Sequence, residues 1–552
     1  PNAANNSGKI LATVLVLLCF LSLRNFIADE GFPIIRDFAP ALYRTQTIAL
    51  FYPLWNLYGS YPTFEEYRFL PTILPLIASV NYELISPELF YKGIFLSILL
   101  MALLSSYFSV ASFLLRRGGN RRNCYLAAFV ASLCFVFSPA AMNMLFDWPL
   151  WIGYALSPIL FWFYISALKT NDDPCPYIVA ASILWLLSAI KAHWIVYGPM
   201  LLYSWLVYDG LIALASRDYE TLSRDLKRTL CVSAIYGSLS AYWILPYLSA
   251  MQMGSLGPTF LLSLETLRSL SGWDSLHTFT LQSIFWPVVQ ATPQQPAFRI
   301  LWISLGLVTP GLAFSAVILF PKDRLVRFFT ILACVSAALT MGLGGPLSFL
   351  YRWLILESPI ASEWGWLFRA SGKWNVFLGL SYSFLVGNTV VWILERLASV
   401  NIVRIRLRAP RLSAKTLRTL LVVLLSFSSL LYCWPALTGD LNGALSPVKV
   451  PDEILETNAW LEKKEGDFKV SWIPPLMSLP KWQLNWNKYP VTDFYSLSSS
   501  NPSIGQWTPF SGRYYRFLYE DLLTNNRTSH MNRLLGFAGT RYVVYHDDLR
   551  RN

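Results

Sequence analysis

Long runs of apolar residues alternate with short polar segments along most of this chain. Each run is about 20 residues long, which is the length that an α-helix needs to cross roughly 30 Å of hydrocarbon. The pattern therefore predicts about eleven transmembrane helices, near residues 10–27, 89–115, 124–145, 150–168, 177–190, 195–215, 230–248, 300–320, 328–350, 374–394 and 419–436.

The pattern changes after residue 437. There, PDEILETNAWLEKKEGDFKVSWIPP is typical of a helix followed by a strand, and TRYVVYHDD alternates as a strand does, after a helical HMNRLLGFAG. We predict an all-α polytopic transmembrane domain over residues 1–437, with a long external first loop over residues 29–70. A small external α/β domain is expected over residues 438–552.

Composition supports a membrane protein and argues against nucleic acid as a partner. Hydrophobic residues make up 55% of the 552 residues and charged residues only 14%. The net charge of +12 would suggest nucleic acid if taken alone, but the basic residues gather in short loops between the apolar runs. Six of the seven cysteines lie in or beside those runs, and no C-x-x-C pair occurs, so neither a disulfide framework nor a zinc site is indicated.

Lysine and arginine residues are concentrated on alternate loops, which predicts the orientation of the chain. One set of loops carries residues 116–122, Lys169, 217–228, 322–327 and 396–418, and the positive-inside rule puts this set in the cytoplasm. The N-terminus is then cytoplasmic and the C-terminal domain extracellular, in a multi-pass protein of the plasma membrane. The first apolar run lacks a small-residue cleavage site, so we expect it to be a retained signal anchor.

The first loop carries the acidic residues that could act as a base. Asp29 and Glu30 lie where the first helix leaves the membrane, and Asp37 follows eight residues later. A partly desolvated carboxylate at the lipid boundary can act as a general base. The alternative is that these acids are solvated at a helix end. A divalent cation bound to Asp29, Glu30 or Asp37 stays open as well.

Basic residues at two other places could bind a phosphate group. Arg369 and Lys373 in LFRASGKW are spaced i and i+4, so on a helix they would face the same way. Two adjacent cations without a nearby acid favour an anion between them, and a lipid phosphate would serve. Lys191 and His193 in SAIKAHWIVY interrupt an apolar stretch on the same predicted outer face. Interfacial anchoring and snorkelling are the alternatives for these cations.

Aromatic residues complete the predicted site. Trp55, Trp148, Trp364 and Trp366 could stack on a sugar or line the path of a lipid, and they fit an interfacial aromatic belt equally well. Asp274 and His277, in GWDSLHTF, are more typical of an ordinary loop. The chain has no H-E-x-x-H motif, no Walker loop and no Gly-rich dinucleotide fingerprint, so we predict no dedicated metal site.

Two motifs resemble a known family. PLWNLYGSYPTFEEYRFLPTILP in the first loop and LFRASGKW before a late span are similar to motifs of the α-(1→3)-arabinofuranosyltransferase-type enzymes and their archaeal relatives. The second is similar to the family's Leu-Arg-x-x-x-Lys-Phe pattern, with Trp374 at the aromatic position. Together with the acids after the first span and the external C-terminal region, these motifs resemble the GT-C superfamily of integral membrane glycosyltransferases.

The resemblance implies an inverting glycosyltransferase at the outer face, with a polyprenyl-phosphate-linked sugar as donor and a glycan or glycoconjugate as acceptor. It implies Asp29 as the general base, with Asp37 or Glu30 as the alternatives, and Arg369 and Lys373 as phosphate ligands assisted by Lys191 and His193. A non-catalytic membrane subunit that binds a lipid-linked glycan, or that scaffolds a complex, is the competing hypothesis. The sugar, the acceptor and the oligomeric state are left open.

Overall fold

The structure is a computed structural model that describes most of the helical region and parts of the rest. The described residues are 2–31, 86–190, 192–252, 264–271, 273–282, 292–293, 295–359, 361–399, 413–466, 468–473, 482–484, 517–523, 525, 527–537, 539–547 and 549–551.

The chain forms two compact units. Unit 1 comprises Pro1–Leu23, Leu96–Tyr242 and Phe260–Ala444, and unit 2 comprises Arg24–Phe95, Trp243–Thr259 and Leu445–Asn552. The boundary that the sequence predicts between a membrane domain and an external domain, at residue 438, stays a prediction.

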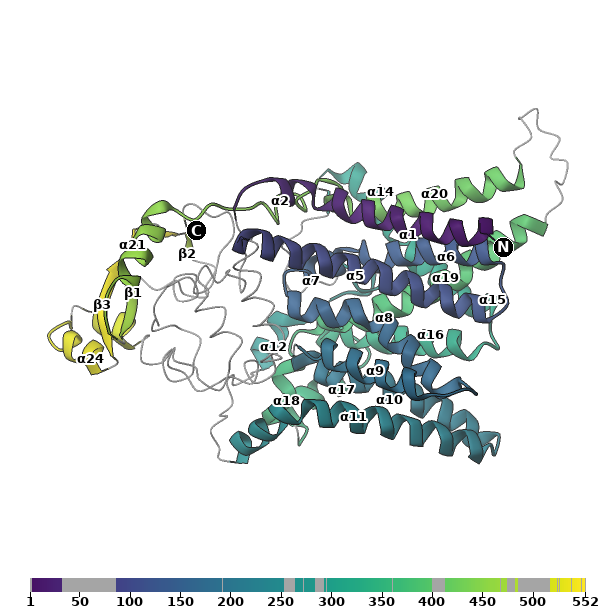
Figure 1. The fold of residues 1–552 in the computed structure, drawn as a ribbon, viewed down its shortest axis with the longest axis horizontal. Coiled ribbons are helices and arrows are strands. Elements are labelled where there is room, and N and C mark those ends of the chain that lie inside the picture. The colour runs from purple at the N-terminus through teal and green to yellow at the C-terminus, as the bar shows by residue number, and fades with distance from the viewer. Residues whose placement is uncertain are drawn as a thin grey trace. The chain divides into compact units, whose positions relative to one another are not determined.

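Unit 1 is built from helices, and its long helices run alongside one another (Figure 1). Two of the helices, α5 and α11, extend into unit 2. The helices are α1 (Asn2–Ser22), α5 (Pro87–Arg116), α6 (Arg121–Val136), α7 (Pro139–Met144), α8 (Trp148–Lys169), α9 (Cys175–Ser188), α10 (Ala192–Ala215), α11 (Tyr219–Gln252), α12 (Leu264–Leu270), α13 (Ser275–Phe279), α14 (Pro296–Gly306), α15 (Val308–Leu319), α16 (Arg324–Thr340), α17 (Ser348–Arg352), α18 (Ala361–Phe368), α19 (Asn375–Ser399) and α20 (Ala414–Tyr432), with short turns η3 (Gly342–Gly344), η4 (Trp353–Glu357), η5 (Ser371–Trp374) and η6 (Trp434–Leu437).

Six helices in the described part of the chain are long and apolar enough to cross a membrane, and Asn6–Ser22 and Cys175–Ser188 are shorter apolar helices. The chain is therefore a helical membrane protein, while the count of about eleven spans stays a prediction. Two local predictions are wrong. The first span is interrupted at Leu23, between α1 and α2 (Arg24–Ala28), and the predicted loop 217–228 is largely the first part of α11. That loop alternates acids and bases, which an amphipathic helix accommodates on its polar face.

The core of unit 1 is centred on α19, which packs against α6, α15 and α16. Stacked phenylalanines fill it: the rings of Phe329 and Phe384 lie 4.4 Å apart and those of Phe161 and Phe328 lie 5.7 Å apart. Small residues allow close approach, since a Cβ added at Gly379 would lie 2.6 Å from the Tyr154 hydroxyl. Packing of this kind holds helices together where lipid gives no hydrophobic driving force.

Unit 2 combines α2 and the first turns of α5 with a small α/β part. Helix α21 (Asp452–Glu462) precedes β1 (Lys469–Ile473), and α24 (Met531–Phe537) precedes β3 (Thr540–Tyr545), as the sequence predicts. Strands β1 and β3 pair in parallel (Figure 1), and Trp472 lies opposite Val544 in their register. The ring of Trp460 on α21 packs edge-on against the ring of Tyr542 on β3, with 5.3 Å between the ring centroids.

The remaining described elements of unit 2 are short. They are β2 (Trp482–Leu484) and β4 (Leu549–Arg551), which pair antiparallel, and η7 (Phe517–Leu523).

Candidate functional site

The chain breaks its helical path immediately before α19. Helix α18 ends at Phe368, Ala370 has an extended conformation, and the 3₁₀ turn η5 follows with Lys373 in it. The expectation that Arg369 and Lys373 share one helical face is therefore wrong. Their i, i+4 spacing lies across a helix break, so the two side chains are placed by a loop and a turn.

Two residues far from this break in the sequence stabilise it. The buried hydroxyl of Tyr351, on α17, lies 3.0 Å from the Phe368 carbonyl and 2.9 Å from the Arg369 carbonyl, and it donates to these helix-end acceptors. Gly342 has a φ of +58°, and a Cβ there would lie 2.6 Å from that of Ser271 and 3.0 Å from that of Ser371. Glycine is thus required where η3 approaches the turn that carries Lys373.

A second break, between α9 and α10, places His193 in the first turn of α10. The neighbouring Trp194 donates from Nε1 to the Leu150 carbonyl at 2.8 Å. Its ring lies directly over Gly153, where an added Cβ would come within 2.2 Å. The start of α10 is therefore fixed against the start of α8, which the short segment after α7 leads into.

These three segments meet at Lys373. Its ammonium lies 3.1 Å from Nε2 of His193 and 3.7 Å from Oδ2 of Asp147, the residue that precedes α8. Because the ammonium can only donate, Nε2 must accept, which assigns a neutral imidazole with its hydrogen on Nδ1. His193 is buried and Lys373 is 14% exposed. The arrangement places a cation at the junction of three helix ends.

Asp147 is the member of this cluster that the sequence analysis missed. The premise of two cations without a nearby acid is wrong, because the Asp147 carboxylate lies close to Lys373. Asp147 occupies the N-cap position of α8, and its side chain makes no capping hydrogen bond there. The only sequence signal was a single acid in an otherwise apolar turn, FDWPLW.

Aromatic residues surround the cluster. Tyr197, fully buried on α10, lies 5.3 Å from Trp374 and 6.0 Å from His193, and Phe368 stacks on Trp374 at 5.5 Å. Of the predicted lining residues, Trp148 begins α8 next to Asp147 and is partly exposed. Trp364 and Trp366 lie on α18, but their side chains are outside the described part of the structure, as are Trp55 and Lys191 altogether.

In unit 2, Asp29 and Glu30 lie in the turn that follows α2. The side chains of Asp29 and Glu30 are exposed, and Glu30 forms an ion pair with Lys449 at 2.5 Å. The hydrogen bond from Lys449, aided by its charge, holds the pKa of Glu30 below its usual value. A base with a lowered pKa accepts protons less readily, which argues against Glu30 as the base. Asp37 lies outside the described residues.

Within the described residues, no cluster of three or more His, Cys, Asp or Glu side chains could hold a metal ion.

Asp274 caps α13: its Oδ1 accepts from the His277 backbone N–H at 2.8 Å, and its Oδ2 lies 2.7 Å from His277 Nδ1. This pair is a local helix cap.

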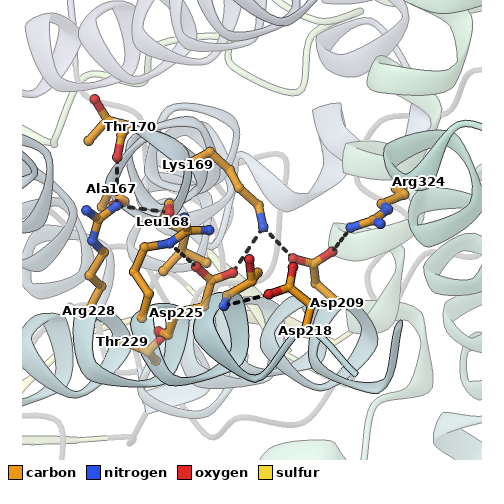
Figure 2. A network of polar contacts seen from close by, with 12 residues as sticks. Ala167, Leu168, Lys169, Thr170, Asp209, Asp218, Asp225, Arg228, Thr229 and Arg324 are labelled. Carbon is orange, nitrogen blue, oxygen red and sulfur yellow. Dashed lines mark hydrogen bonds and ion pairs between the residues drawn. The ribbon is translucent and has the colours of Figure 1, made fainter. Parts of the chain in front are cut away.

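Unit 1 also contains a second charged cluster, which we call the Lys169 network (Figure 2). Lys169, at the end of α8, lies 2.5 Å from Oδ2 of Asp209 on α10 and 3.0 Å from Oδ2 of Asp225 on α11. Arg324, at the start of α16, lies 3.3 Å from Asp209, and Arg228 donates to the carbonyls of Ala167, Leu168 and Thr170. Both aspartates are buried. Their ion pairs therefore connect the end of α8 with α10, α11 and the start of α16.

The two clusters agree with the predicted alternation of loops. Asp147, His193 and Lys373 all come from segments predicted on the outer face, and Lys169, Arg228 and Arg324 come from segments predicted in the cytoplasm. Residues assigned to one face thus meet in one place. Which of the two faces the cytoplasm stays a prediction.

The long apolar helices and the charged clusters at their ends define a polytopic membrane protein. Its fold resembles that of a solved arabinofuranosyltransferase, the kind of enzyme to which the sequence motifs are similar. The structure of the arabinofuranosyltransferase AftD from mycobacteria matches with a TM-score of 0.63 at 13% sequence identity, over 98% of this chain and 35% of that chain. This chain thus spans about a third of that protein's length.

A mutant of AftD matches with a TM-score of 0.46 at 16% identity, over 90% of this chain and 32% of that chain. No protein-family model matches this chain, and no curated protein matches it.

Proposed function

We propose that this chain is a membrane glycosyltransferase that takes a sugar from a polyprenyl-phosphate-linked donor at the outer face of the membrane. The observation that carries the proposal is the contact between Lys373 and His193. These residues are 180 positions apart, and the sequence suggests each of them separately as a phosphate ligand. The likeness of the fold to an arabinofuranosyltransferase supports the same conclusion.

The proposed reaction is a single displacement with inversion. The acceptor hydroxyl oxygen forms a bond to the anomeric carbon, its proton passes to Asp29, and the bond from the anomeric carbon to the phosphate oxygen breaks. The electron pair leaves with the phosphate, whose developing charge Lys373 stabilises together with Arg369. His193 orients the Lys373 ammonium by accepting one of its hydrogens. Arabinofuranose is the first donor sugar to test.

Phosphate binding tests the Lys373 cluster directly. The full chain in lipid nanodiscs is titrated with farnesyl phosphate, a short-chain lipid phosphate without sugar. Loss of a charge-assisted hydrogen bond in Lys373→Met should weaken binding on the order of 10- to 100-fold. Lys415→Met, at an exposed lysine of α20, is the matched control and should bind as the wild type does. Equal affinity in Lys373→Met and the wild type would overturn the phosphate site.

Turnover tests the base. With farnesyl-phosphate-linked arabinofuranose as donor and water or a glycan panel as acceptor, Asp29→Asn should lower the rate by about 10²- to 10⁴-fold, the contribution of a general base. Glu30→Gln and Asp37→Asn test the two alternative bases, Glu30 and Asp37, in the same assay. If all three variants leave the glycan output of the native host unchanged while farnesyl phosphate still binds, the non-catalytic subunit is the correct description.

A further inference from the structure

The turn that carries Asp29 is held by a lysine that has no assigned role. Asp29 follows directly on α2, and its N–H closes the last turn by donating to the Asn25 carbonyl at 2.9 Å. Lys92 lies opposite on α5, and Phe26 of α2 packs edge-on against Phe95 of α5 at 5.6 Å. The Lys92 side chain is only 4% exposed, so its charge must be satisfied within the protein.

The structure gives the Lys92 ammonium three acceptors for its three hydrogens. It donates to Oε1 of Glu88 at 2.6 Å, to the Ile27 carbonyl at 3.4 Å, and to the carbonyl of Asp29. The carbonyls at a helix end have no partner within the helix, and a positive charge is favourable beside them. Lys92 therefore fixes residue 29 through its backbone and leaves the Asp29 carboxylate exposed.

Glu88 and Gly31 complete the arrangement. The carboxylate oxygen of Glu88 that pairs with Lys92 also accepts from the Gly31 N–H at 3.0 Å. Gly31 has a φ of +120°, and a Cβ there would lie 2.7 Å from the Val448 backbone. The turn is thus held between α5 and the segment before α21, in a conformation that only glycine allows.

We propose that Lys92 is a positioning residue for Asp29: together with Glu88 it fixes the backbone of the Asp29–Gly31 turn so that the Asp29 carboxylate is presented in one orientation. The inference rests on the proposed function, in which Asp29 is the base. A direct role as a phosphate ligand does not fit Lys92, because its three hydrogens are used inside the turn and its side chain is buried. Lys449 differs, since it binds the exposed carboxylate of Glu30.

Amide hydrogen exchange tests the arrangement without any substrate. The full chain in nanodiscs is followed by mass spectrometry of a peptide covering residues 24–31. In Lys92→Met, exchange at the Gly31 amide should be faster on the order of tenfold, because Glu88 loses the partner that holds it in place. Lys92→Arg, which keeps the charge and the donors, should retain most of the protection. Lys415→Met, at an exposed lysine of α20, is the control and should leave exchange at Gly31 at the wild-type rate.

A double-mutant cycle with the farnesyl-phosphate-linked arabinofuranose donor tests the role in turnover. A misplaced base lowers kcat on the order of a hundredfold, so Lys92→Met should do this with little change in KM, and Lys92→Arg should restore most of the rate. In the Asp29→Asn background, Lys92→Met should cause no further loss, because both changes remove the same contribution. Lys92→Gln, which keeps a donor, replaces Lys92→Met if that variant does not fold.

The possible results separate this inference from the proposed function. Unchanged exchange at Gly31 in a folded Lys92→Met or Lys92→Gln overturns the inference whatever the activity. A full additional loss from Lys92→Met in the Asp29→Asn background also overturns it, because Lys92 would then act independently of Asp29. If Asp29→Asn alone keeps the wild-type rate, the proposed base is wrong and the positioning role falls with it. Faster exchange at Gly31 together with a non-additive loss of kcat supports both the positioning role of Lys92 and the role of Asp29 as the base.

Discussion

Two lysines of unit 1, Lys169 and Lys373, lie at the ends of apolar helices with acids beside them, yet their surroundings differ. Lys169 is within 3.0 Å of two buried aspartates, and arginines contact the same carboxylates (Figure 2). Lys373 has a neutral histidine at 3.1 Å and one carboxylate at 3.7 Å, too far for a hydrogen bond between them. The first lysine belongs to a structural network of ion pairs, and the second is the one that we propose as a phosphate ligand.

The largest effect should come from breaking the Lys169 network. Lys169→Met leaves two buried carboxylates without their shared cation, and the free energy of unfolding should fall by about 3 kcal/mol. Thermal unfolding in nanodiscs measures it, with Lys227→Met, an exposed lysine on α11, as the control. Lys373→Met should change stability by less than about 1 kcal/mol. Equal losses in Lys169→Met and Lys373→Met would contradict the division into a structural and a functional lysine.

A substitution that shifts the turn carrying Lys373 should lower both the stability of the fold and the affinity for phosphate. Gly342→Ala brings a Cβ against Ser271 and Ser371 at a positive φ, so the free energy of unfolding should fall by about 1 to 3 kcal/mol. Farnesyl phosphate should also bind more weakly, because Ser371 belongs to the same turn as Lys373. Gly311→Ala, where the added Cβ meets nothing within 4 Å, is the control and should bind normally.

The Asp274–His277 pair shows how much stability we expect from an acid that only caps its own helix. Asp274→Ala removes the N-cap of α13, which should cost about 1 kcal/mol of stability. The hydrogen bond from the His277 backbone lowers the pKa of Asp274, so this contribution is present above the unfolded-state pKa near 3.8 and is lost as the pH falls through the lowered value. The free energy of unfolding, measured between pH 7 and pH 2, checks it: a difference between Asp274→Ala and the wild type that is as large at pH 2 as at pH 7 would contradict the prediction.

The smallest effect should come from neutralising Asp147. Asp147→Asn removes a negative charge beside Lys373, so the affinity for farnesyl phosphate should rise about threefold while stability changes by less than about 1 kcal/mol. Asp172→Asn, in an exposed loop, should change neither quantity. A fall in affinity would show instead that Asp147 holds Lys373 in place. Asp209→Asn in the Lys169 network should cost stability without changing affinity.

Much of the helical frame could be predicted because it depends on local pattern. The apolar runs match α5, α8, α10 and α19 to within a few residues, and α21, β1, α24 and β3 lie where the periodicity places them. The sequence suggested Lys373 from its i, i+4 spacing with Arg369, and His193 together with Lys191 from their place in an apolar stretch. The helix break at Arg369–Ala370 was missed, because i, i+4 spacing is compatible with a helix and nothing local shows the hydroxyl of Tyr351 that stabilises the break.

Hydrophobicity therefore determined the class of protein and the position of several long helices, since both depend on the transfer of short segments into lipid. The face on which each loop lies stays a prediction from the alternation of charge. Only the tertiary structure decided which polar groups meet. Asp147 beside Lys373, Lys92 beneath Asp29, and Asp209 and Asp225 around Lys169 are pairs formed by helix packing across dozens to hundreds of residues. A buried charge is stable only where such a partner is supplied, and the partner's identity is set by the fold.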